Sequence, residues 1–183
     1  MRKLYMFNLM TLDGYFARPD GSIDWHNVDD EFNRFAEDQL TDTGGLVFGR
    51  VTYDLMAGYW PTEQGTEDDH VIAKAMNSLP KLVFSRSLDK VDWQNSRLAK
   101  GDLKDEITKF KQASDKPVGL FGSSNLAGSL IPLGLIDEFR ILVAPIVLGA
   151  GKPLFPNVQN QFKLKRESTR NFKNGNVLLT YSL

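Results

Sequence analysis

Three short apolar runs of the sequence are each followed by small, polar or basic residues that could bind an anion. These residues are Gly49, Arg50 and Thr52 after the run at 46–48, Ser85 and Arg86 after the run at 82–84, and Gly122, Ser123, Ser124, Asn125 and Leu126 after the run at 120–121. Arginine offers a permanently charged fork to phosphate, and the start of a helix offers free N–H groups. The pattern favours phosphate binding if the three segments meet in the fold.

The elements around these segments would bring them together. Apolar runs at 4–10, 46–48, 82–84 and 118–121 predict buried strands, and helical spacing predicts helices at 29–40, 51–58, 102–112 and 125–135. Alternating strands and helices are typical of a parallel sheet, in which the carboxyl ends of the strands line one crevice. Each segment alone is better explained as a turn, a helix cap or a surface residue, but the three together lead us to expect a phosphate-rich ligand such as a dinucleotide there.

The C-terminal part of the chain has a different pattern. Residues 137–149 are typical of a long strand interrupted by Pro145, and residues 162–183 alternate apolar and polar side chains around Asn174-Gly175. Asn-Gly predicts a type I′ hairpin turn. We expect one α/β domain over residues 1–183, with a mostly parallel central sheet and a C-terminal antiparallel hairpin. The acidic segment 62–70 is predicted to be a surface loop, and His26 and His70 to be exposed loop residues.

Composition excludes several classes of protein. The chain has 183 residues, a net charge of -1 and a pI of about 6.1, so no whole-chain basic field favours nucleic acid. There are no cysteines, which excludes disulfides, thiolate metal sites and a cysteine nucleophile. With only two histidines and no GxSxG elbow, hydrolase chemistry is disfavoured and no metal site is expected. Neither GxGxxG after the first strand nor a P-loop is present.

The N-terminal segment resembles a signal peptide only superficially. Arg2 and Lys3 precede an apolar run, but Asn8, Thr11 and Asp13 interrupt it and no cleavage site follows. No stretch is long enough to span a membrane. We therefore expect a cytoplasmic protein with no membrane partner.

Several motifs together carry a family resemblance. TLDGYFA, GGLVFGRVTYD, KLVFSRSL and LFGSSNLAGSLIPLGLIDEFRILVAPIVLGAGKPLF occur in this order before the closing hairpin. The chain resembles the dihydrofolate reductase-like superfamily over nearly its whole length. The nearest resemblance is to the reductase domain of the bifunctional deaminase/reductase of riboflavin biosynthesis. The CxxC zinc signature of the deaminase half is absent. The resemblance implies a stand-alone reductase domain with the three-layer α/β fold of that superfamily.

The resemblance also implies NADPH as the cofactor. Gly49, Arg50 and Thr52 match the motif that meets the adenosine side and the diphosphate, and Ser85 and Arg86 match the pair that reads the ribose 2′-phosphate. The diphosphate loop is matched by Gly122, Ser123, Ser124, Asn125 and Leu126. The family often has Gly-Gly where this chain has Gly122-Ser123.

The substrate side is implied more weakly. Asp30 follows Trp25 at the distance of the carboxylate that holds the ring in dihydrofolate reductases, and we assign it to substrate holding or proton management. Acidic residues in a first helical turn are equally explained by the helix dipole. Trp25 and Asp13 are the other residues that we assign to the substrate. Lys152 and Arg18 are candidates for a phosphate contact.

These features support three functional hypotheses. The leading one is an NADPH-dependent reductase of a pyrimidine- or pterin-like heterocycle, similar to 5-amino-6-(5-phosphoribosylamino)uracil reductase. The second is dihydrofolate reductase, and the third is a nucleotide-binding module without catalysis. The expected partner is a small heterocyclic substrate. The superfamily implies a homodimer, for which the apolar segment 141–149 could supply an interface or equally serve as a core strand.

Overall fold

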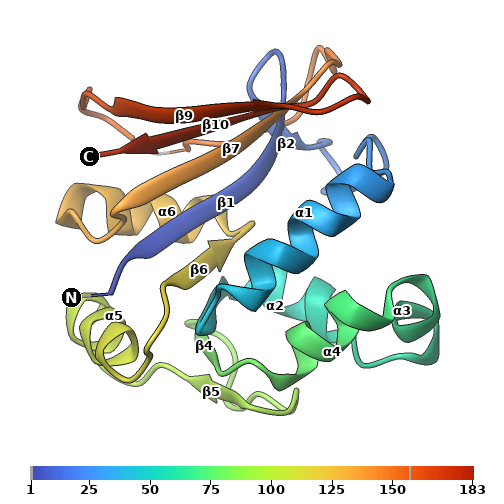
Figure 1. The fold of residues 1–183 in the computed structure, drawn as a ribbon. Coiled ribbons are helices and arrows are strands. Elements are labelled where there is room, and N and C mark those ends of the chain that lie inside the picture. The colour runs from blue at the N-terminus through green and yellow to red at the C-terminus, as the bar shows by residue number, and fades with distance from the viewer. Residues whose placement is uncertain (1, 157) are drawn as a thin grey trace.

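A central sheet of eight strands organises the chain, as the computed structural model shows (Figure 1). The structure describes residues 2–156 and 158–183. The strand order is β5-β4-β3-β6-β1-β7-β10-β9. The strands are β1 (Leu4–Thr11), β3 (Gly45–Gly49), β4 (Lys81–Phe84), β5 (Ser96–Leu98), β6 (Val118–Phe121), β7 (Glu138–Ala144), β9 (Lys165–Asn171) and β10 (Val177–Ser182). A separate small ribbon pairs β2 (Tyr15–Ala17) with β8 (Lys152–Pro153).

The strand directions confirm the predicted fold class. β1 pairs in parallel with β6 and β7, β3 with β4 and β6, and β4 with β5. β10 runs antiparallel to both β7 and β9. The carboxyl ends of β1, β3, β4 and β6 therefore meet at one edge of the sheet, as the sequence predicts.

Alternation along the strands produces two cores and three layers. Tyr5, Phe7 and Leu9 of β1 belong to one apolar cluster, whereas Leu4 and Met6 belong to the other. The first cluster packs against α1 (Asp30–Thr41), α2 (Arg50–Ala57) and α4 (His70–Ser78), and the second against α5 (Leu103–Gln112) and α6 (Ser124–Leu130) (Figure 1). A short 3-10 turn (Ile131–Leu133) follows α6.

The predicted loop at 62–70 is wrong, because it contains helix α3 (Glu63–Asp68) and the start of α4. Thr62 caps α3 by accepting from the Gly65 N–H at 3.1 Å. Gly65 packs so closely against the Tyr59 carbonyl that a side chain would collide with it. His70 is exposed, but it begins α4 rather than lying in a loop.

The C-terminal hairpin is present, but its predicted type I′ turn is wrong. Gly175 has a φ of +91°, whereas Asn174 does not adopt positive φ. The Gly175 N–H donates to the Phe172 carbonyl at 3.1 Å, and the Phe172 N–H donates to the Asn176 carbonyl at 2.9 Å. The turn therefore uses one left-handed residue at its end instead of two in its centre.

Two further features of the structure concern segment 141–149 and the character of the helices. Ile141, Leu142 and Ala144 are buried within the protein, so the first part of segment 141–149 is a core strand. No helix in residues 2–156 or 158–183 combines the length and apolarity needed to cross a bilayer.

Candidate functional site

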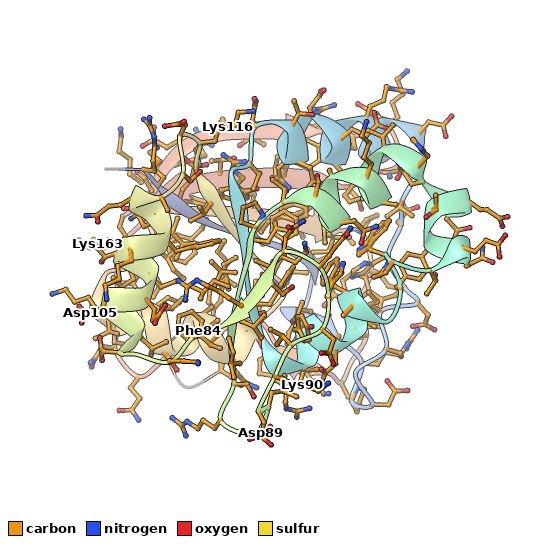
Figure 2. All side chains as sticks on the ribbon, turned by 90° about the horizontal axis from the view of Figure 1, so that it is seen from below. Phe84, Asp89, Lys90, Asp105, Lys116 and Lys163 are labelled. Atoms are coloured by element: carbon orange, nitrogen blue, oxygen red, sulfur yellow. The ribbon has the colours of Figure 1, made fainter. Side chains whose placement is uncertain are left out.

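A cavity of about 840 Å³ lies at the carboxyl ends of the parallel strands. Strand order places β4, β3, β6 and β1 side by side, so three strand spacings give the cavity a reach on the order of 14 Å. Phe84, the last residue of β4, lines it. Figure 2 shows Phe84 near the middle of the molecule, and Asp89 and Lys90 at the edge of the loop that continues from it.

All ten residues assigned to the cofactor line this cavity: Gly49, Arg50, Thr52, Ser85, Arg86, Gly122, Ser123, Ser124, Asn125 and Leu126. They come from the ends of three different strands and from the first turns of α2 and α6. The structure therefore brings together what the sequence places up to 77 positions apart. Their role toward a nucleotide stays a prediction.

Two hydrogen bonds tie the loop after β3 to the loop after β6. The Gly49 N–H donates to Ser123 Oγ at 2.9 Å, and the Ser123 N–H donates to Thr52 Oγ1 at 2.9 Å. Gly122 and Ser123 are both left-handed, with φ of +59° and +49°. This reciprocal pair of bonds fixes the two loops relative to each other. The N–H groups of Gly49 and Ser123 are consequently occupied by protein acceptors.

In the described part of the chain, three helices have their first residue in the cavity wall, α2, α5 and α6, and two of them are uncapped at their N-termini. Neither Gly49 before α2 nor Ser123 before α6 makes a side-chain capping bond. By contrast, α1, α3, α4 and α5 are capped by Asp29, Thr62, Asp69 and Asp102, respectively. The first-turn N–H groups of α2 and α6 thus have no side-chain acceptor and can take an external anion.

Two arginines add positive charge at the same end of the cavity. Arg50 is half-exposed and pairs with Asp54 at 3.1 Å on the same helix. Arg86 is exposed and has no ion pair with the described residues. Ser85 Oγ accepts from the Ser87 and Leu88 N–H groups at 3.1 and 3.0 Å, and so shapes the turn that carries Arg86.

The residues assigned to the substrate do not reach the cavity. Asp30 is exposed on the first turn of α1, and its neighbour Asp29 caps that helix by accepting from the Phe32 N–H at 2.9 Å. Trp25 is 7% exposed and belongs to the core beneath α1. Neither Asp30 nor Trp25 lines the cavity. This arrangement matches the ordinary helix-dipole explanation for the acidic first turn.

Asp13 is occupied by contacts within the protein. Its carboxylate accepts from Thr11 Oγ1 at 2.6 Å, from the Leu148 N–H at 3.2 Å and from the Gly149 N–H at 2.8 Å. The Thr11 hydrogen bond, with help from the two backbone bonds, holds the pKa of Asp13 below its usual value. Asp13 therefore joins the turn after β1 to the loop after β7.

Two polar cavity residues were not found by sequence reasoning. Asn8 is 4% exposed on β1, and its Oδ1 has no hydrogen-bond partner. His26 Nε2 is likewise buried without a partner, and burial lowers the pKa of His26 to about 4. His26 does lie in a loop, but the prediction that it is exposed is wrong. The only available signal was a polar residue, Asn8, within the apolar run of the first strand.

The cavity wall carries cations but no anions. Its charged residues among those that the structure describes are Arg50, Arg86 and Lys152, and no aspartate or glutamate lines it. Lys152 comes from β8, beyond β1. Arg18, the other candidate phosphate contact, instead pairs with Asp24 at 2.6 Å and does not line the cavity. The charge of the wall therefore favours an anionic or neutral ligand over a cationic one.

Fold and cavity together define a dihydrofolate reductase-like α/β protein. The profile of the RibD C-terminal domain family matches residues 2–178, and the chain belongs to that family, the reductase domain of riboflavin biosynthesis. In Bacillus subtilis (strain 168), the uncharacterized protein YyaP is 33% identical over 180 residues, covering 98% of this chain and 94% of the relative. The uncharacterized protein YwjB of the same organism is 28% identical over 178 residues, covering 93% and 92%.

Solved structures agree with this assignment. A putative riboflavin biosynthesis protein from Shewanella sp. PV-4 superposes with a TM-score of 0.76 at 25% identity, over 98% of both chains. The deaminase/reductase of Thermotoga maritima superposes with a TM-score of 0.68 at 14% identity. This chain covers 56% of that longer protein, and the likeness shows the shared fold.

Proposed function

We propose that the protein is an NADPH-dependent reductase of a pyrimidine-type heterocycle, similar to 5-amino-6-(5-phosphoribosylamino)uracil reductase. Membership of a reductase-domain family supports the reaction class. The single observation that carries the cofactor assignment is the contrast between capped and uncapped helices. Only α2 and α6 lack a side-chain cap among the six α-helices in the described part of the chain. Both begin at the cavity wall, as does α5, which is capped by Asp102.

The chain's own groups fit a phosphorylated dinucleotide. The first turns of α2 and α6 would take the diphosphate, with Arg50 nearby, while Ser85 and Arg86 would meet a ribose 2′-phosphate. Bound NADPH would supply the hydride. The hydrogen bonds from Gly49 and Ser123 hold the phosphate-binding loops in place before any ligand arrives. The cavity then extends past the end of β6 to β1, where the ring of the substrate heterocycle would lie.

The charge of the wall favours the riboflavin-type substrate over dihydrofolate. A carboxylate suits the amino-pyrimidine edge of a protonated pterin, because it can accept two hydrogen bonds from that edge. No carboxylate among the described residues lines the cavity, and Asp30 is exposed outside it. Lys152 stands at the β1 end, where a ribose phosphate on the substrate would benefit from a cation. Dihydrofolate reductase therefore ranks behind the uracil reductase.

A calorimetric titration with NADPH and NADH tests the cofactor assignment. Arg86→Ala should weaken NADPH by about tenfold or more, because a charge-assisted phosphate contact is lost, and leave NADH unchanged. Arg166→Ala is the matched control, since Arg166 is an exposed arginine on β9 at the far edge of the sheet. If neither nucleotide binds the unmodified protein, the reductase assignment is wrong.

Turnover separates the reductase from a nucleotide-binding module. The 5-amino-6-(5-phosphoribosylamino)uracil reductase substrate, incubated with NADPH and the protein, should deplete reduced cofactor, followed by its absorbance. Binding of NADPH without depletion by this or related heterocycles would favour the module that binds nucleotide without catalysis.

A further inference from the structure

Two buried polar atoms at the β1 end of the cavity have no partner in the protein. They are Oδ1 of Asn8 and Nε2 of His26. Leaving such a group unpaired lowers the stability of the folded protein, and buried polar groups in native proteins are normally paired, so two unpaired atoms beside one cavity indicate a ligand contact. Both residues line the cavity, from two different segments of the chain.

Other unpartnered polar atoms show that the position matters. Trp25 Nε1, Ser96 Oγ and Asn176 Oδ1 are also buried without a partner in the described residues. None of these three residues lines the cavity. They therefore provide internal controls, in which an unpaired buried atom has no ligand within reach.

The strand order places these two atoms at the opposite end of the cavity from Arg86. Arg86 follows β4, whereas Asn8 lies on β1, and β3 and β6 separate the two strands. His26 follows β2, which leads on from β1. The orphan atoms thus lie at the end of the cavity remote from Arg86, where the proposed function places the substrate.

We propose that Asn8 and His26 form the substrate-binding pair of this cavity and position the heterocycle by its lactam edge. This inference rests on the proposed function. The Asn8 carboxamide oxygen accepts from a ring N–H, and a neutral imidazole supplies one donor or acceptor for the adjacent ring carbonyl. Both groups are uncharged, which matches the absence of carboxylates from the described cavity wall. The ligand class is an uncharged pyrimidinone, and cationic diaminopyrimidines are excluded.

Variants that replace the polar groups of Asn8 and His26 by apolar groups of similar size provide the test. Asn8→Leu and His26→Phe retain bulk, and Asn8→Ala is a second variant in case the leucine does not fit. Ser96→Ala is the matched control, because Ser96 lies on β5 and does not line the cavity. The probes are NADPH, then 5,6-diaminouracil and 2,4-diaminopyrimidine added to the protein saturated with NADP⁺, each followed by calorimetry. Melting temperature without ligand and the separate KM values complete the readout.

A substrate-binding role predicts that the variants lose affinity for the heterocycle without losing stability or NADPH affinity. Asn8→Leu and His26→Phe should melt no lower than the unmodified protein and bind NADPH within about twofold, yet bind 5,6-diaminouracil roughly tenfold more weakly, the equivalent of one lost hydrogen bond. KM for the heterocycle should increase while KM for NADPH does not. The Ser96→Ala control should leave both affinities unchanged, and 2,4-diaminopyrimidine should not bind the unmodified protein.

Several outcomes would overturn the inference. Unchanged 5,6-diaminouracil affinity in the Asn8 and His26 variants would show that the atoms are merely unpaired. A loss of NADPH affinity in these variants would assign them to the cofactor. Failure of the unmodified, NADPH-binding protein to bind 5,6-diaminouracil would refute the ligand class alone. Failure to bind NADPH at all would instead refute the proposed function, and this inference with it.

Discussion

The two ends of the cavity differ in whether their polar groups are hydrogen-bonded within the protein. At the β3–β6 end, the donors and acceptors of Gly49, Thr52 and Ser123 satisfy each other at 2.9 Å. At the β1 end, Asn8 and His26 keep buried polar atoms without partners. The first end is ordered before a ligand binds. The second end is complete only when something else occupies it.

This difference indicates that the two ends contribute differently to the stability of the free protein and to ligand binding. An internally bonded loop pair costs no rearrangement on binding, which suits a cofactor that must be held in one position. Unpaired polar groups lower the stability of the free protein and recover it when a matching ligand arrives. Mutations at the two ends should therefore have opposite signatures in stability and binding.

Gly122→Ala should produce the largest effect, because it disrupts the ordered end. Gly122 is left-handed, and a Cβ there would lie 2.9 Å from both Thr52 Cγ2 and Oγ1. The left-handed penalty and the collision with Thr52 together should cost about 2–4 kcal/mol of unfolding free energy. NADPH affinity should fall as well. Urea denaturation and calorimetry measure the two effects.

Gly134→Ala is the control for Gly122→Ala. Gly134 has a similar φ of +63°, but nothing lies within 4 Å of its would-be Cβ. It should cost only about 1 kcal/mol and leave NADPH binding unchanged. Equal losses in the two variants would show that the bonds between Thr52 and Ser123 do not define the ordered end.

Burial of His26 at the β1 end should make the stability of the protein depend on pH. The pKa of His26 is lowered by burial from 6.5 to about 4. Between these values the unfolded chain binds more protons than the folded protein, so stability falls as pH decreases. The loss from pH 7 to pH 5 should be about 2 kcal/mol. His26→Phe should flatten this slope in urea denaturation.

His70→Gln is the control for the pH experiment, because His70 is an exposed histidine at the start of α4. This variant should keep the slope of the unmodified protein. A slope that survives in His26→Phe would mean that His26 is protonated in the folded protein at pH 5, and the β1 end would then not be a desolvated site.

The ordered end could be predicted from the sequence, whereas the unsatisfied end could not. Gly49, Arg86 and Ser123 follow apolar runs, and local sequence indicates both the strands and the residues that end them. The hydrogen bonds between the loops depend on the same strand ends meeting. His26 reaches the cavity through the path of the long segment between β2 and α1, for which local sequence has no periodic signal.

Errors in the prediction of elements have identifiable physical causes. α3 was missed because its acidic, glycine-containing sequence has the composition of a loop, although the Thr62 cap and the contact of Gly65 with Tyr59 favour a helix. α4 carried a usable signal, since Ile72 and Met76 are buried at helical spacing after the capping residue Asp69. The hairpin type failed because the glycine, not the asparagine, supplies the positive φ.

Ser123 should show the smallest effect, and two variants resolve it. Ser123→Ala loses the bond to the Gly49 N–H but keeps a left-handed side-chain residue, so unfolding free energy should fall by about 1 kcal/mol. Ser123→Gly loses the same bond and also removes the left-handed penalty of about 1 kcal/mol, so its stability should match the unmodified protein. The difference between the two variants in urea denaturation therefore measures the backbone strain, and the alanine variant alone measures the bond. If Ser123→Ala is as stable as the unmodified protein, the bond contributes nothing, and the β3–β6 end is held by backbone geometry rather than by the side chain that distinguishes this chain from a Gly-Gly loop.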